Sequence, residues 1–281
     1  MYKEVNKMSE NKKKPIVLTI ANNKGGVGKT TAAAAITHLL SLKGKRVLLI
    51  DTDPQGNCAQ QFGIDSTDDI GLLGELLLDR VNRNSDAKHA PLENYIVKSP
   101  VVPEIDVLSG GKPLNKAVYT VIFAVNSVVA ANVFRRIMKE ADMYDYVVVD
   151  TSPSFSSFTD AVFMGTDWVL APMLPDKNSI DGVNTLFKYL APIREEGEHD
   201  IRVAGVFFNQ ANDRSRALHE FEPLIREGWK DDVLKTKIPV NPAAVAGAIN
   251  DDQPVTLKYP VAKATKAYKK LVEEVLARVE A

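Results

Sequence analysis

The order of hydrophobic runs along the chain is the feature that most restricts its fold. Short runs rich in β-branched residues alternate with longer segments of helical periodicity, which is typical of β-α-β units in a mostly parallel sheet. The runs are apolar on both faces, as in central strands that helices cover on each side. The pattern predicts strands over residues 16–21, 46–50, 105–108, 146–149, 168–172 and 203–208, with a weaker one over 233–238.

Helical periodicity fills the intervals between these runs. It predicts helices over residues 30–43, 119–141, 180–195, 217–227 and 262–280, and residues 79–103 are interpreted as a surface excursion. No Pro/Ser/Gly-rich linker divides the chain and no internal repeat is visible. We therefore expect one domain over residues 15–281, preceded by a basic tail over residues 1–14.

Composition excludes several classes of protein. The chain is 45% hydrophobic and 25% charged, which is ordinary for a globular protein and unlike a collagen-like or wholly disordered one. The single cysteine, Cys58, can form no internal disulfide, so a reduced, cytoplasmic setting is expected. The most apolar stretch, residues 121–134, contains three polar residues and falls short of the roughly 18 apolar residues of a membrane span, so it is interpreted as a buried helix.

A glycine-rich loop follows the first expected strand directly and leads into a helix. Its glycines would let successive backbone N–H groups point at phosphate oxygens, and the helix N-terminus would add its positive dipole. Lys29 is expected to reach the β- and γ-phosphates of ATP, and the Thr30 hydroxyl to take a Mg²⁺ position. The residues expected to bind the nucleotide here are Lys24, Gly25, Gly26, Val27, Gly28, Lys29, Thr30 and Thr31.

This loop departs from the ordinary P-loop because Asn23 stands at the position of the first glycine and a second lysine, Lys24, follows it. In this it resembles the deviant Walker A ATPases of the MinD/ParA superfamily, and among them the ParA/Soj-type partition proteins. The resemblance extends through LLIDTDPQGN at residues 48–57 and YDYVVVDTSPS at residues 144–154. It implies an α/β fold, a single-domain P-loop NTPase whose mostly parallel, twisted sheet of about seven or eight strands has helices on both faces. It also implies that Lys24 crosses a dimer interface to contact the partner's nucleotide.

Three aspartates are placed where open α/β sheets bind ligands, at the carboxyl ends of expected strands. The resemblance favours Asp53 for positioning the attacking water and Asp51 for metal-linked support, and the alternative is that one of them caps the following turn. Asp150 matches a Walker B aspartate that binds Mg²⁺ through water, with a structural cap as the alternative. The residues expected to act in catalysis are thus Lys24, Lys29, Asp51 and Asp53.

Two later segments resemble the family's base-binding region. Asn209 ends a predicted strand, where its amide could hydrogen-bond adenine, and Pro239 and Asn241 match a family stretch that begins Ile-Pro-Arg-Asn. Val240 replaces the arginine of that stretch. For Asn209 and Asn241 the alternative is a role as turn residues only.

The net charge of −1 conceals an uneven distribution. Residues 1–14 and residues 258–281 each carry an excess of three positive charges, and the remainder is acidic, which suggests an acidic partner. In the last helix, lysines recur every three or four positions, so we expect them on one side. The resemblance implies non-specific binding of double-stranded DNA there, and a solvated helix face is the alternative. These lysines are Lys263, Lys266, Lys269 and Lys270.

Taken together, the resemblance implies a weak ATPase that partitions plasmid or chromosomal DNA. It would form an ATP sandwich homodimer, bind nucleoid DNA in the cytoplasm, and be released when a centromere-binding ParB-type adaptor stimulates hydrolysis. The alternative is a MinD-like membrane-positioning ATPase, but the terminal helix lacks the Phe and Trp of a lipid-binding face. An iron–sulfur protein of the nitrogenase type would need paired cysteines, and a DNA-specific autoregulator would need an added helix-turn-helix before residue 16.

Overall fold

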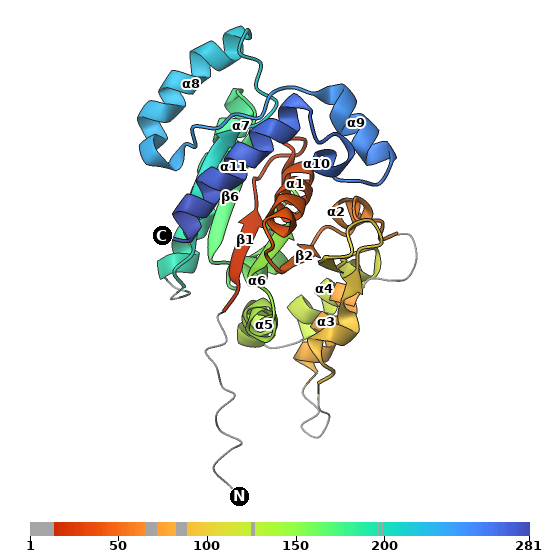
Figure 1. Ribbon diagram of the computed structural model, residues 1–281. Coiled ribbons are helices and arrows are strands. Elements are labelled where there is room, and N and C mark those ends of the chain that lie inside the picture. Colours follow the sequence, from red (N-terminus) through yellow and green to blue (C-terminus); the bar gives the residue numbers. More distant parts are fainter. Residues whose placement is uncertain (1–13, 66–71, 83–88, 125–126, 196, 198) are drawn as a thin grey trace, which may run out of the picture.

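A seven-stranded sheet forms the centre of the computed structural model, which describes residues 14–65, 72–82, 89–124, 127–195, 197 and 199–281 (Figure 1). The strand order is β3-β4-β2-β5-β1-β6-β7, and neighbouring strands are parallel except for the antiparallel pair β3 and β4. This confirms the predicted α/β class. The strands are β1 (Ile16–Ile20), β2 (Val47–Asp51), β3 (Val97–Lys98), β4 (Ile105–Leu108), β5 (Tyr146–Asp150), β6 (Trp168–Met173) and β7 (Arg202–Phe208).

Helices cover both faces of this sheet because successive strand residues point to opposite sides. Leu18 and Val148 pack into a cluster with α1 and α11, whereas Val17 and Val147 pack into a second cluster with α3 to α6. A third cluster joins β6 and β7 to α7 and α8. The helices are α1 (Lys29–Leu42), α2 (Asn57–Gln60), α3 (Leu72–Val81), α4 (Pro113–Ala124), α5 (Ser127–Glu140), α6 (Ser157–Phe163), α7 (Lys177–Glu195), α8 (Arg216–Trp229), α9 (Pro242–Asn250), α10 (Val255–Lys258) and α11 (Lys263–Val279), with 3₁₀ turns η2 (Leu92–Tyr95) and η3 (Lys230–Asp232).

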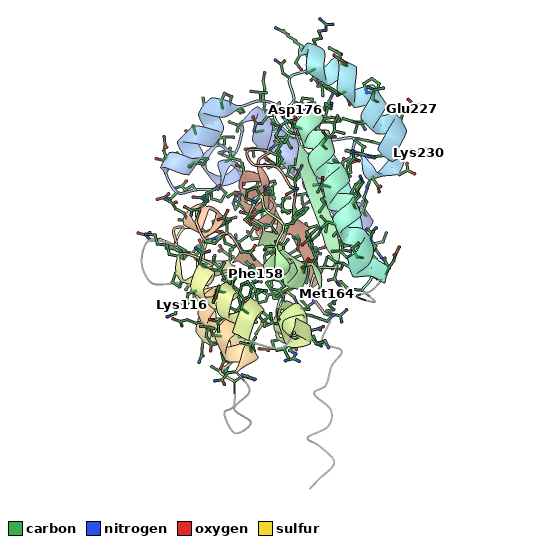
Figure 2. The ribbon with its side chains drawn as sticks, turned by 180° about the vertical axis from the view of Figure 1, so that it is seen from behind. Lys116, Phe158, Met164, Asp176, Glu227 and Lys230 are labelled. Atoms are coloured by element: carbon green, nitrogen blue, oxygen red, sulfur yellow. The ribbon has the colours of Figure 1, made fainter. Side chains whose placement is uncertain are left out.

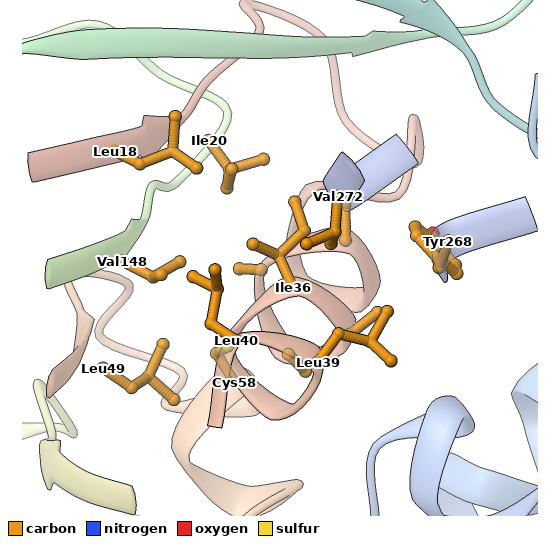
Figure 3. Packing of buried hydrophobic residues seen from close by; sticks show 14 of the residues in the cluster. Leu18, Ile20, Ile36, Leu39, Leu40, Leu49, Cys58, Val148, Tyr268 and Val272 are labelled. Atoms are coloured by element: carbon orange, nitrogen blue, oxygen red, sulfur yellow. The ribbon is translucent and has the colours of Figure 1, made fainter. Parts of the chain in front are cut away.

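Helix α1 lies between the sheet and α11 and positions the loop that precedes it (Figure 3). Four consecutive alanines, residues 32–35, are fully buried, and their small side chains let the helix approach the strands closely. Ile36 and Leu40 extend the same contact, and each such side chain stabilises the fold by about 2 kcal/mol when it leaves water. The core thus fixes the helix at whose N-terminus the glycine-rich loop sits.

The single helix predicted over residues 119–141 is wrong. The structure has two helices here, since α4 ends at Ala124 and α5 begins at Ser127. Residues 125 and 126, between these two helices, lie outside the described residues. Burial in this region is also uneven: Val121 and Phe134 are fully buried, but Phe123 is 72% exposed.

The weak strand predicted over residues 233–238 is also wrong. This segment lies beside β7, but it forms only isolated β-bridges there. They join Val206 with Val233 and Ala211 with Pro239. The physical reason is a competing acceptor. The Glu274 carboxylate on α11 accepts the backbone N–H groups of Lys235 and Thr236 at 2.7 and 3.0 Å, so these groups are not available for a strand ladder.

Several short elements have no strong periodicity and were not predicted, among them α2, α3, α6, α9 and the edge strand β3. Residues 79–103, interpreted as a surface excursion, contain η2 and β3. Residues 1–13 of the predicted basic tail lie outside the described residues. Among the described helices, none combines the length and apolarity that crossing a membrane requires.

Candidate functional site

The glycine-rich loop connects β1 to α1 with two glycines in the left-handed region, Gly26 at φ 74° and Gly28 at φ 87°. A Cβ at Gly28 would lie 2.1 Å from Asn209 Nδ2, so no larger residue fits without displacing this neighbour. Lys29 is buried, and its Nζ donates a hydrogen bond to the Lys24 carbonyl at 3.0 Å. Burial lowers the pKa of Lys29, and the charges of Asp150 and Asp53 offset part of this. The ammonium is therefore held inside the curve of the loop, where an anion would favour its charged form.

The second lysine of the loop, Lys24, is bound within its own chain. Its Nζ donates to Asp176 Oδ1 at 2.8 Å and to Ser179 Oγ at 3.2 Å. Figure 2 shows Asp176 at the N-terminal end of α7. Although burial opposes the effect, hydrogen bonds from Lys24 and the Ser179 N–H lower the pKa of Asp176. Lys24 must leave this carboxylate before it can contact a second subunit.

Asp51 is a buried carboxylate whose two oxygens are both occupied by backbone groups. Oδ1 accepts the N–H of Asp53 at 3.0 Å, and Oδ2 accepts the N–H groups of Cys58 and Ala59 at 2.9 Å each. Burial raises the pKa of Asp51 to about 6, against the lowering effect of these hydrogen bonds. Asp51 thus holds the turn that carries Asp53.

Asp53 combines a turn contact with an accessible carboxylate. Its Oδ1 accepts the Gln55 N–H at 2.9 Å, while the residue is half-buried and its charge acts on Lys29. Within the described ranges, no second hydrogen bond to this carboxylate is seen. Of the two aspartates in this loop, Asp53 is therefore the one that could orient a water molecule.

Asp150 is the unsatisfied acidic group of the site. It pairs in register with Asp51 across β5 and β2, is 1% exposed, and neither carboxylate oxygen has a hydrogen-bond partner among the described residues. Burial, and then the neighbouring charge of Asp51, raise the pKa of Asp150 well above its usual range. The nearby Thr30 side chain and the Lys29 charge act in the opposite direction and lower this pKa. A buried carboxylate is costly unless it is compensated, and these two groups compensate Asp150 only in part. Its oxygen chemistry and its position beside the loop fit Mg²⁺ bound through water.

The loop after Asp150 is anchored by aromatic packing. The centroids of the Phe155 ring and of the Tyr189 ring on α7 are 4.5 Å apart. Ser156 and Thr159 form a reciprocal capping box at the start of α6. The Tyr189 hydroxyl donates to Asp160 at 2.5 Å, which fixes the ring that Phe155 contacts. Helix α7 thus touches both this loop and Lys24.

A cavity of about 280 Å³ lies beside the glycine-rich loop. It brings together residues from distant parts of the sequence: the loop itself, the end of β7, the segment before α9, and α11. Residues that the sequence predicted for the nucleotide are among them. The lining residues are Gly28, Thr31, Asn209, Gln210, Ile238, Pro239, Val240, Asn241, Pro242, Val245, Ala246, Ile249, Ala264 and Tyr268.

Asn209 supports the loop from inside this cavity. It is 4% exposed, its Nδ2 donates to the Val27 carbonyl at 2.8 Å, and its Oδ1 accepts the Gln210 N–H at 3.0 Å. Much of its hydrogen-bonding capacity is therefore used within the protein. Asn241 immediately precedes α9, and its side chain makes no capping hydrogen bond to this helix.

The predicted lysines of α11 divide between two sides of the helix. Lys263, Lys266 and Lys270 line a second cavity of about 510 Å³ together with Lys235 and Lys237. Lys237 is paired with Asp213 and Glu222 at 3.0 Å each, whereas no acidic partner is seen for the other four among the described side chains. Lys269 lies apart from this group: its charge acts on His38 of α1.

Sequence reasoning missed Asp176, Ser179, Gln210 and Tyr268. No motif marks these residues, because each reaches the site through tertiary contacts. A weak signal exists for Asp176, since it follows a predicted strand as the other aspartates do, at the edge where such sheets bind ligands.

Comparison with known proteins agrees with this geometry. A family model described as an AAA domain (AAA_31) matches residues 15–203, more than half of the chain. The chain belongs to this family. Chromosome partitioning protein ParA of Caulobacter vibrioides is 29% identical to it over 262 residues, covering 93% of this chain and 94% of that protein. Chromosome-partitioning ATPase Soj of Thermus thermophilus is 28% identical over 265 residues, covering 94% and 96%.

Solved structures give the same fold. The septum site-determining protein MinD of Pyrococcus horikoshii, complexed with Mg-ADP, has a TM-score of 0.70 at 21% identity and covers 95% of this chain and 99% of its own. The chain is thus a ParA/Soj-type ATPase of the MinD/ParA superfamily, as the resemblance implied.

Proposed function

We propose that this ParA/Soj-type ATPase partitions DNA by an ATP-dependent cycle of dimerisation and DNA binding. The observation that carries the proposal is the pair of lysines in one loop. Lys29 is buried within the loop, whereas Lys24 is partly exposed and held by an ion pair that it can exchange. One cation would neutralise the bound nucleotide and the other would act across an ATP sandwich homodimer, as an arginine finger does.

The reaction is hydrolysis of ATP to ADP and phosphate. Backbone N–H groups of residues 25–31 and the Lys29 ammonium bind and orient the phosphates, and the Asp53 carboxylate orients the attacking water. Thr30 and Asp150 would hold Mg²⁺, which neutralises phosphate charge. Asp51 keeps the Asp53 turn in place through its three backbone hydrogen bonds.

Non-specific DNA binding follows from the distribution of lysines. Four lysines form a basic cavity wall with no acidic partner among the described side chains, and a dimer would double it: Lys235, Lys263, Lys266 and Lys270. Release of the protein from DNA on hydrolysis would require a partner that stimulates the ATPase. For this partner we propose a centromere-binding ParB-type adaptor. The protein would then be cytoplasmic and associated with the nucleoid, with residues 15–281 acting as one domain and residues 1–14 as a basic tail.

The test is dimerisation and DNA co-sedimentation with Mg-ATP. Lys29→Ala should lose nucleotide binding, and Lys24→Ala should lose the dimer while still binding ATP. Asp176→Asn is the matched control, because it frees Lys24 without removing it and should dimerise at least as well as the wild type. Unchanged ATP-dependent co-sedimentation in both lysine variants would overturn the proposal.

A MinD-like membrane role is the second candidate, favoured only by the shared fold. The apolar residues of α11, such as Leu271, Val272 and Val275, are buried against the core, so this helix offers no bulky apolar face to lipid. Flotation with anionic liposomes and ATP tests this membrane role, and we expect the protein not to bind the liposomes.

A further inference from the structure

The cavity beside the glycine-rich loop is lined by a tyrosine whose hydroxyl group has no hydrogen-bond partner among the described residues. Tyr268 of α11 lines this cavity and is 1% exposed. No hydrogen bond joins its Oη to any residue within the described ranges, and burial alone raises its pKa. A hydroxyl at a cavity wall that makes no hydrogen bond within the protein keeps its donor and acceptor capacity for a ligand.

The direction of the side chain brings this hydroxyl toward the cavity. Helical side chains lean toward the N-terminus of their helix, so Tyr268 extends over Ala264, one turn earlier, which lines the same cavity. The small Ala264 side chain leaves room there. Figure 3 shows Tyr268 at the margin of the core cluster, apart from the strand residues Leu18 and Val148.

The remaining cavity wall suits a flat aromatic ring. Pro239, Val240 and Ile249 supply apolar surface, while the Asn209 amide is largely used by the protein itself. A cavity of apolar walls with few convergent polar groups is typical of a small-molecule site. The phosphate loop opens onto this same cavity through Gly28 and Thr31.

We propose that Tyr268 Oη hydrogen-bonds the purine base of the nucleotide whose phosphates the loop binds, and so serves as an affinity-determining residue for that base. The inference rests on the proposed ATPase function. It assigns to α11 a direct contact with the ligand, in addition to its packing against α1.

The experiment compares Tyr268→Phe with the wild type by calorimetric titration with Mg-ATP and with Mg-tripolyphosphate, which lacks the base. Removal of the hydroxyl should weaken ATP binding about fivefold and leave tripolyphosphate binding unchanged. Because the hydroxyl makes no hydrogen bond to the part of the chain that the structure describes, the Tm of the ligand-free variant should equal or exceed that of the wild type.

Tyr146→Phe is the matched control. The Tyr146 hydroxyl donates to Glu280 at 2.6 Å, so its removal should lower the Tm without changing ATP affinity. Wild-type affinity for ATP in Tyr268→Phe, or equal weakening for both ligands, would overturn the inference. Failure of the wild type itself to bind ATP would instead overturn the proposed function, so the two failures are distinguishable.

Discussion

At the scale of single residues, Gly28 determines the conformation of the glycine-rich loop. Its φ of 87° suits glycine, and Asn209 Nδ2 occupies the space where a side chain would begin. Asn209 in turn binds the carbonyl of Val27 next to it. The side chain of Asn209, the residue after β7, thus contacts the glycine-rich loop at both Val27 and Gly28. The backbone conformation of the loop depends on this contact.

Gly28→Ala should therefore lower the free energy of unfolding by about 2 kcal/mol and abolish ATP binding, because the Cβ meets Asn209. Urea unfolding and ATP titration measure the two effects. Gly25→Ala is the control: a Cβ there meets nothing within 4 Å, so its unfolding free energy should stay within about 0.5 kcal/mol of the wild type. Equal destabilisation by both substitutions would contradict this account.

At the scale of elements, α1 depends on α10 and α11 for its position. His38 of α1 is 3% exposed and its Nδ1 shares a hydrogen bond of 2.8 Å with Thr256 Oγ1 of α10. Burial, and then the charge of Lys269 on α11, lower the pKa of His38 below its ordinary value of 6.5. The imidazole is thus neutral in the folded protein at a pH where the unfolded chain already binds a proton.

This difference makes stability depend on pH. Below pH 6.5 the unfolded chain takes up a proton at His38 that the folded protein does not, so the unfolding free energy should fall as pH drops from 7 toward 5.5, by up to about 1 kcal/mol per pH unit. His38→Gln should flatten this slope in urea titrations. His219→Gln, at an exposed histidine of α8, should leave the slope as in the wild type. An unchanged slope in His38→Gln would refute the assignment.

At the scale of the whole molecule, the charge near zero hides a basic surface. Lys235 lies beside three lysines of α11 because the segment after η3 is held to this helix by Glu274. Those three are Lys263, Lys266 and Lys270. Phosphate contacts release counterions, so DNA binding there would weaken steeply with salt.

Lys266→Ala should reduce the slope of log K against log salt by about one for each protomer bound, and weaken binding uniformly across DNA sequences. Fluorescence anisotropy with ATP at several salt concentrations measures this. Lys269→Ala removes the same charge from the other side of α11 and should have little effect. A larger loss of DNA affinity in Lys269→Ala than in Lys266→Ala would show that DNA does not bind on the Lys266 side of α11.

The sequence by itself determined the α/β class, six of the strands, the phosphate loop and the three aspartates at strand ends. These depend on local period and on motifs that short stretches of chain carry. It did not determine the conformation of residues 233–238 or the partners of Lys24. Those outcomes depend on Glu274 and Asp176, which lie far in sequence from the groups they contact. Only the tertiary structure decides them, because a hydrogen bond between distant segments leaves no periodic signal in either one.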